Sequence, residues 1–237
     1  MAKRAAAPSD APATPEQLIR PPLQRRSQES LERVLQAGVE VLLEVGYEGF
    51  TLQEVSKRSG VSIGSIYARA PSKETLILAI YDREMAKVSE ANERLRETAR
   101  LEDLKGRELI IALVELMARS TLEHADILRV FMYRALVDPE IWRRGSQRSS
   151  DLARAFEEAL LDHKDELNHP DPDLAIDVAF RMVYNTLVRR VSHGDKFESQ
   201  RPLSEEDLIR ELGEAVADYL LAPELPRQRR KPAKRRR

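Results

Sequence analysis

The chain has 237 residues, enough for one large or two small domains. It contains no cysteine, which excludes disulfides, thiolate catalysis and cysteine-ligated zinc. No apolar run approaches the ~20 residues that span a bilayer, and the first residues lack the apolar core of a signal peptide. We therefore expect a cytoplasmic protein without a membrane partner, and the low content of glycine and of β-branched alternation indicates an all-α fold.

Charge is unevenly distributed along the chain, although the formal net charge is only −1. Residues 23–73 hold seven basic and six acidic side chains, whereas residues 74–226 hold 21 basic and 32 acidic ones. Residues 227–237 hold eight basic side chains and no acidic one. DNA would repel the acidic stretch and tolerate the near-neutral one, so this asymmetry would orient the molecule on DNA.

The first 22 residues are rich in alanine and proline, which indicates a disordered arm. Arg25 and Arg26 follow directly, just before the first predicted helix. Such arginines can enter a minor groove or contact phosphates, although a solvated leader fits the same residues equally well.

The first predicted helix begins near Ser27 and ends at Gly46, which tolerates the left-handed conformation of a helix end. Apolar residues recur on one of its faces at helical spacing. We expect it to be a scaffold that fixes the angle of the next two helices. Its apolar residues are Leu31, Val34, Leu35, Val41, Leu42 and Val45.

Residues 51–69 form two short predicted helices separated by a tight turn. Thr51 and Glu54 have the spacing of a capping box, in which each side chain accepts from the other residue's backbone N–H. Gly60 suits the turn, and Ser62 can cap the second helix at once. The pattern predicts a helix-turn-helix, whose second helix enters the DNA major groove. A plain helical hairpin with a polar face has the same periodicity.

Two segments in and after this region, residues 60–67 (GVSIGSIY) and 71–76 (PSKETL), resemble the DNA-binding signature of TetR-family transcriptional regulators. Ala37, the Gly46-Tyr47 pair and Thr51 extend the resemblance, which covers about a fifth of the chain. The chain departs from the family at Ala70, where a large aromatic residue is usual. An alanine there implies either a neighbour that fills the space or a looser corner.

The resemblance implies roles for individual side chains. Thr51 and Tyr67 would hold phosphates, while Gln53 would make a bidentate contact with adenine and Ile63 would pack on a thymine methyl group. Few base-reading donors are present, so we expect phosphate contacts and DNA shape to matter. The full expected DNA-binding set is Arg25, Arg26, Thr51, Gln53, Ser62, Ile63, Gly64, Ser65, Tyr67, Arg69 and Lys73.

The rest of the chain predicts a helical body. A helix capped by Ser72 continues toward Arg100, and its polar part from Glu84 onward is expected to face solvent. Further helices are expected over residues 109–122, 127–137 and 139–167, then from Asp173, as a cap, to residue 191, and from Ser204, also a cap, to residue 220. The apolar stripes of the last two helices either form a four-helix dimer interface or close the monomer core. The resemblance favours the dimer. Their stripes are Leu174, Val178, Met182, Val183, Leu187 and Val191, then Leu208, Leu212, Ala215, Tyr219 and Leu220.

A body of this size exceeds what dimerisation needs, and helix bundles form internal pockets. We therefore expect a small-molecule effector to bind there and to change the separation of two DNA-binding heads. Aromatic, methionine and polar residues of the middle helices are the candidates for lining it. They are Met117, His124, Phe131, Tyr133, Trp142, Phe180 and Tyr184.

Two other functional classes compete with this interpretation. The four histidines are scattered, and the sequence holds no HExxH motif, phosphate-binding loop or nucleophile elbow, so an all-α enzyme is disfavoured. We expect no metal and no cofactor. A helical adaptor that binds protein through the same head is the remaining alternative.

The predicted organisation has four parts: a disordered arm (1–22), a three-helix helix-turn-helix head (23–73), a helical ligand-binding and dimerisation body (74–222) and a basic tail (223–237). The expected function is that of a repressor that binds an inverted-repeat DNA operator as a homodimer and is released by the effector.

Overall fold

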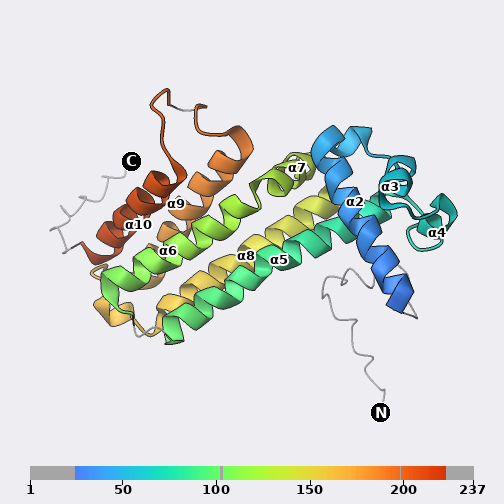
Figure 1. Ribbon diagram of the computed structural model, residues 1–237. Coiled ribbons are helices and arrows are strands. Elements are labelled where there is room, and N and C mark those ends of the chain that lie inside the picture. The colour runs from blue at the N-terminus through green and yellow to red at the C-terminus, as the bar shows by residue number, and fades with distance from the viewer. Residues whose placement is uncertain (1–24, 102–103, 198, 223–237) are drawn as a thin grey trace, which may run out of the picture. The chain divides into compact units, whose positions relative to one another are not determined.

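The computed structural model describes residues 25–101, 104–197 and 199–222. Within these ranges every regular element is a helix, which confirms the predicted all-α fold (Figure 1). The elements are α2 (Arg25–Gly49), α3 (Leu52–Ser59), α4 (Ile63–Tyr67), α5 (Lys73–Leu101), α6 (Gly106–Glu123), α7 (Ala125–Ala135), α8 (Pro139–Leu161), the 3₁₀ turn η1 (Lys164–Glu166), α9 (Pro172–His193) and α10 (Glu205–Leu221).

The chain divides into two compact units, and both long helices α5 and α8 contribute to each. The first, here called the head unit, contains the chain up to Glu90 together with His124–Ser149. The second, the body unit, contains Ala91–Glu123 and the chain from Ser150 onward. The boundary predicted between residues 73 and 74 is a functional one and stays a prediction.

The head unit is built around α2, whose apolar face packs against α3, α4 and the start of α5. Phe50 and Leu42 are fully buried there, as are Ile77 and Ile80 of α5. α7 and the start of α8 extend the same core through Phe131 and Ile141. The ring of Phe131 meets Tyr81 edge-on, with 4.9 Å between centroids. α3 and α4 therefore share one core with parts of α5, α7 and α8.

Local sequence signals fix the ends of the short helices. The Thr51 hydroxyl caps α3 by accepting from the Glu54 N–H at 3.2 Å, as predicted. The Glu54 carboxylate, however, pairs with Arg58 at 3.3 Å, so the reciprocal half of the expected capping box is replaced by an ion pair. Gly60 ends α3 in the left-handed conformation (φ 67°), and Ser62 caps α4. These residues set the predicted turn.

The expected end of the first helix at Gly46 is only partly correct. Gly46 adopts φ 68° and breaks the helical backbone, but helical residues resume and continue to Gly49. The kink allows Tyr47 and Phe50 to reach the core of the head unit, where Phe50 is buried and Tyr47 partly so. The physical basis of the prediction, the freedom of glycine at positive φ, holds.

The expectation that the polar part of α5 faces solvent is wrong at its start. Glu84 is buried, as is the nearby Asp82. Ion pairs explain this burial, because the Glu84 carboxylate contacts Arg83 at 2.6 Å and Lys87 at 2.9 Å. Charged residues enter protein interiors when they are paired in this way.

In the body unit α6, α9 and α10 pack against one another around a second apolar core. α8 ends at Leu161, earlier than the predicted end near residue 167, and η1 follows. The cap of α9 is Asp171, whose carboxylate accepts from the Leu174 N–H, and not the predicted Asp173. The cap of α10 is Ser204, as predicted.

The face of α10 that packs into the core of the body unit lies about one residue from the predicted apolar stripe. The buried face consists of Ile209, Gly213, Val216, Ala217 and Leu220. Gly213 faces α6, where a Cβ atom would make an ordinary contact of 3.5 Å with Ile111 Cγ2. The other predicted stripe residues form a second, half-exposed apolar face: Leu208, Leu212, Ala215 and Tyr219.

Candidate nucleic-acid interface

The outer face of α4 presents small and polar groups to solvent. Gly64, Ser65 and Tyr67 are exposed, and the Tyr67 side chain is 47% exposed. Ile66 is buried on the opposite face, and Ile63 is half-buried against the core. This arrangement leaves a shallow surface that a major groove can approach closely, with the Tyr67 hydroxyl as a hydrogen-bond donor.

α3 presents Gln53 on its exposed face. Lys57 is four residues later on the same face, exposed, with no contact to the described residues. Sequence reasoning did not select Lys57, although its spacing of four from Gln53 could have revealed it. Together the two residues offer an amide suited to a base edge and an ammonium suited to a phosphate.

Two hydroxyls of the predicted DNA-binding set are engaged as helix caps. Thr51 accepts from the Glu54 N–H, and Ser62 accepts from the Ser65 N–H at 3.3 Å. The Ser62 and Ser65 hydroxyls are also 2.8 Å apart, and either can donate to the other. Both capping residues remain exposed, and the Thr51 hydroxyl keeps its hydrogen for a further contact.

Arg69 and Lys73 are held by contacts inside the head unit. Arg69 donates to the Ser27 hydroxyl at 2.5 Å, and Lys73 donates to the Tyr47 carbonyl at 2.6 Å. The Lys73 ammonium also lies 4.7 Å from the centre of the Tyr47 ring, and Arg134 stacks on that ring at 3.7 Å. Burial raises the pKa of Tyr47 above its usual value. Both predicted phosphate ligands therefore have structural partners.

Arg58 is similarly committed, because its guanidinium contacts Glu44 of α2 at 2.6 Å and Glu54 at 3.3 Å. The hydrogen bond that Arg58 donates to Glu44 is the main reason that the pKa of Arg58 is raised. The side chains of Arg25 and Arg26, the arm over residues 1–22 and the basic tail all lie outside the described part of the structure.

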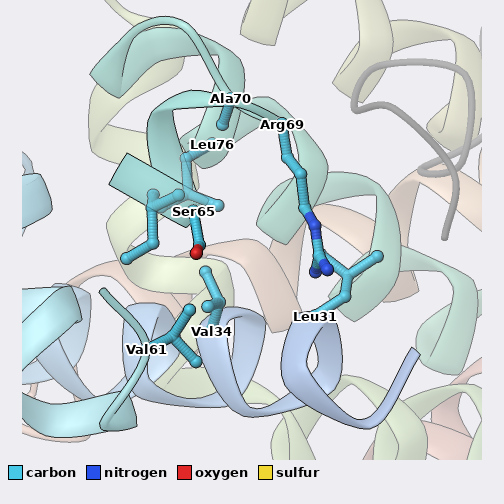
Figure 2. A pocket seen from close by; sticks show the side chains of 8 residues that line it. Leu31, Val34, Val61, Ser65, Arg69, Ala70 and Leu76 are labelled. Carbon is cyan, nitrogen blue, oxygen red and sulfur yellow. The ribbon is translucent and has the colours of Figure 1, made fainter. Parts of the chain in front are cut away.

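A small cavity lies behind the exposed face of α4 (Figure 2). About 10 Å³ of it can hold the centre of a water molecule. Ala70, which is 1% exposed, forms part of its wall, so the neighbours of this alanine leave a residual void. The lining residues are Leu31, Val34, Val61, Ser65, Ile66, Arg69, Ala70 and Leu76.

The seven predicted effector-binding residues are divided between the two units. Met117, Phe180 and Tyr184 belong to the body unit, where the Phe180 and Tyr184 rings stack with centroids 5.5 Å apart. Phe131 is buried in the head unit, where Tyr133 and Trp142 are strongly exposed. His124 precedes α7 in the same unit. Only the first three are therefore candidates for one common pocket.

The described residues contain no group of three or more histidine, aspartate or glutamate side chains placed to hold a metal. His163 contacts Glu166 at 3.0 Å, and this hydrogen bond is the main cause that lowers the pKa of Glu166. Lys164 contacts Asp173. These contacts link polar residues of the segment 162–166 to one another and to α9, within the body unit.

Comparison with known proteins agrees with this geometry. Residues 34–80 match the family model described as bacterial regulatory proteins, tetR family. HTH-type transcriptional regulators from Mycobacterium tuberculosis and Mycobacterium bovis are 39% identical to the chain over 44 residues. That match covers 19% of the chain and 23% of each relative, so the chain spans about a quarter of the length of these relatives.

Solved structures share the fold over most of the chain. A TetR-family regulator from Mesorhizobium loti has a TM-score of 0.62 and 18% identity, covering 83% of this chain and 97% of that one. GusR from Salmonella enterica has a TM-score of 0.58 and 20% identity, covering 83% and 98%. A regulator from Aquifex aeolicus has a TM-score of 0.53 and 22% identity, covering 80% and 96%.

The mycobacterial relatives and the Mesorhizobium loti protein are described as transcriptional regulators. Among the described helices none has the length and apolarity to cross a membrane. The family model falls on α2–α5, the elements that present the exposed residues of α3 and α4. Residues 34–80 thus resemble the tetR family of bacterial regulatory proteins in sequence, and the described residues share the fold of the solved regulators.

Proposed function

We propose that the chain is a sequence-specific transcriptional repressor that binds an inverted-repeat operator as a homodimer and is released by a small molecule. The observation that carries the proposal is the exposed surface of α3 and α4. It combines Gln53 and Lys57 of α3 with Gly64, Ser65 and Tyr67 of α4. The Gln53 amide suits a base edge, and the small residues Gly64 and Ser65 permit close approach. Lys57 and Tyr67 supply donors for phosphates.

The assignment of phosphate contacts follows from which donors are free. Arg58, Arg69 and Lys73 have partners inside the head unit, whereas Lys57 and the Tyr67 hydroxyl are exposed. We assign the phosphate contacts of the α3–α4 surface chiefly to Lys57 and Tyr67, with Thr51 and Ser62 as exposed hydroxyls nearby. Repression needs only that the bound protein obstruct a promoter.

Dimerisation is supported by the second apolar face of α10. Leu208, Leu212 and Tyr219 are half-buried and Ala215 is exposed, although the adjacent face of α10 fills the core of the body unit, against which Leu212 and Tyr219 also pack. α9 carries a comparable outer face with Leu174 and Met182 exposed. Two such helices from each copy would form a four-helix interface, and two-fold symmetry would present two heads to one operator.

Release by an effector is supported by the size of the body unit and by its aromatic cluster. The rings of Phe156, Phe180 and Tyr184 lie next to one another, at 6.1 Å and 5.5 Å between successive centroids. Met117 belongs to the same core. A ligand that favours the non-binding state with a coupling of 1–3 kcal/mol would weaken DNA binding ~5–150-fold.

The experiment that tests the function is selection from a randomised duplex pool with purified full-length protein at fixed salt. We expect an inverted repeat whose half-sites are about one helical turn apart, ~34–36 Å. Binding without enrichment would contradict sequence-specific reading and point to the basic tail. Absence of binding at low salt would favour the adaptor interpretation. The selected duplex then serves to screen small molecules that release it.

A second experiment tests the dimer. The double variant Leu208→Lys/Met182→Lys places charges on the outer faces of α10 and α9, so sedimentation equilibrium should show a monomer that keeps its helical circular dichroism. Glu206→Lys, at an exposed site on the first turn of α10, is the matched control and should stay dimeric. A dimeric double variant would contradict the proposed interface.

A further inference from the structure

The recognition helix α4 depends on tertiary contacts for its position. It has only five residues, two of them Gly64 and Ser65, and an isolated helix of this length is unstable in water. Ile66 is its one fully buried residue, and the Ser62 cap holds its N-terminal end. Its C-terminal end needs support from other parts of the head unit.

Apolar packing below that end is incomplete. Ala70 is buried but small, and the cavity that it borders has room for about one water molecule. The other walls come from Leu31 and Val34 of α2 and Leu76 of α5. Side chains that border a void lose contacts on that side, so the void weakens the support of α4 by the core.

Arg69 provides a second support beside this void. Figure 2 shows its side chain extended from the end of α4 toward Leu31 of α2. Its Nη2 atom donates to the hydroxyl of Ser27, in the first turn of α2. Its Nη1 atom is buried and has no hydrogen-bond partner among the residues that the structure describes. The guanidinium is therefore directed into the protein, and contact with DNA would require it to leave Ser27.

We propose that Arg69 is a positioning residue that fastens the C-terminal end of the recognition helix to α2 through Ser27. This inference rests on the proposed function. It gives Arg69 a role different from the phosphate contact expected from the sequence. Arg69 acts on DNA binding by fixing the orientation of α4, and Ser27 acts with it although it is 42 residues away in the sequence.

The two roles predict different salt dependence. Loss of a phosphate contact weakens binding to all sequences alike and lowers the slope of log K against log salt by about one. Loss of a positioning contact leaves the number of neutralised phosphates unchanged. It therefore weakens binding to the selected duplex, lowers discrimination against a scrambled duplex and leaves the slope as it was.

The test compares Ser27→Ala, Arg69→Ala and the double variant on the selected and scrambled duplexes over a range of salt. We expect Ser27→Ala to weaken binding to the selected duplex about tenfold, the effect of one hydrogen bond to a charged group. Arg69→Ala should lose a similar factor, and the double variant should lose little more than Arg69→Ala. Ser30→Ala, one turn further along α2, is the matched control and should bind normally.

Two results would overturn the proposal: unchanged affinity for Ser27→Ala, or a slope lowered by about one for Arg69→Ala. A urea-unfolding cycle of the same variants without DNA separates this inference from the proposed function. Non-additive midpoints would establish the coupling between Arg69 and Ser27 even if the wild-type protein selects no sequence. Additive midpoints would reject the coupling whatever the DNA result.

Discussion

Two parts of the head unit are held together in different ways. Where α5 meets α8, Arg144 of α8 contacts Asp82 of α5, and these side chains are 6% and 2% exposed. Arg148 of α8 adds hydrogen bonds to the Ser89 hydroxyl and the Met85 carbonyl. α4 is held by one buried isoleucine, one cap and the contact between Arg69 and Ser27.

The comparison separates stability from DNA reading. A buried ion pair strongly disfavours any state that leaves one partner alone, so α8 and α5 should separate only when the unit unfolds. α4 has few contacts, so it can be displaced without unfolding the rest. Changes at the α5–α8 junction should thus act mainly on stability, and changes at α4 mainly on DNA affinity.

Arg144→Met should have the largest effect on stability. It removes the closer partner of buried Asp82, whose pKa is raised by burial, and leaves only Arg148, at 3.7 Å, among the described residues. Breaking a buried pair costs about 3–5 kcal/mol. Urea unfolding measures the loss. Arg143→Ala is the control, because the Arg143 side chain is 52% exposed and its ion pair with Glu140 lies at the surface; it should cost under ~1 kcal/mol. Equal losses for both variants would contradict the special role of the junction.

Ile66→Ala should reduce DNA affinity more than it reduces folding stability. Truncation of a buried isoleucine costs about 2–5 kcal/mol of the packing free energy that holds its helix in place. Since α4 can be displaced locally, we expect a DNA affinity at least ~30-fold lower and an unfolding midpoint that shifts less than with Arg144→Met. The contrary result is an unfolding-midpoint shift as large as that of Arg144→Met, with DNA affinity lost only because the protein unfolds. It would show that α4 is held as firmly as the α5–α8 junction.

Gln53→Ala and Tyr67→Phe distinguish two kinds of DNA contact on the exposed surface. Loss of a bidentate amide contact should remove ~1–3 kcal/mol of discrimination at one base pair of each half-site. Loss of the tyrosine hydroxyl should weaken binding by ~1 kcal/mol regardless of sequence. Binding to single-base variants of the selected duplex measures both. Equal effects of Gln53→Ala on every sequence would reject its assignment as a base reader.

Ala70→Val should make α4 more firmly held. Its two added methyl groups face the cavity below the helix, and filling a small void commonly gains about 1 kcal/mol. The thermal midpoint should rise by a few degrees, and Ser27→Ala should then weaken DNA binding less than in the wild-type protein. A lowered midpoint would show that the void does not accept groups from position 70, since overpacking is destabilising.

The smallest effect is expected from Glu140→Gln, and it depends on pH. Hydrogen bonds from Arg143 and then Arg144 lower the pKa of Glu140 to about 2. A carboxylate with a depressed pKa stabilises the folded state above its unfolded pKa, near 4.5, and this contribution is lost as the pH falls toward 2. Wild type and variant should therefore converge in stability between pH 4.5 and 2. A constant difference across that range would contradict the assignment.

Much of the fold was predictable because its signals are local. Thr51, Ser62 and Ser204 were identified as caps, and Gly60 as the turn residue, from spacings of a few residues, and the structure confirms each one. A side-chain oxygen that accepts from an N–H three residues later needs no distant part of the chain. The exposure of Gln53 and Tyr67 followed from the helical period in the same way.

Tertiary structure decided what depends on distant partners. The face of α10 that enters the core lies about one residue from its most apolar sequence stripe, and it includes Gly213, which faces Ile111 of α6. Asp82 and Glu84 are buried in a stretch that reads as polar, because arginine and lysine partners accompany them. Arg69 turns to Ser27 and Lys73 to Tyr47, contacts across 42 and 26 residues that no periodicity encodes. The sequence by itself determined where α3, α4 and α10 begin, where α3 ends and which residues of α3 and α4 are exposed, because those depend on neighbouring residues. The partners of the charged side chains were set only when folding brought distant helices together.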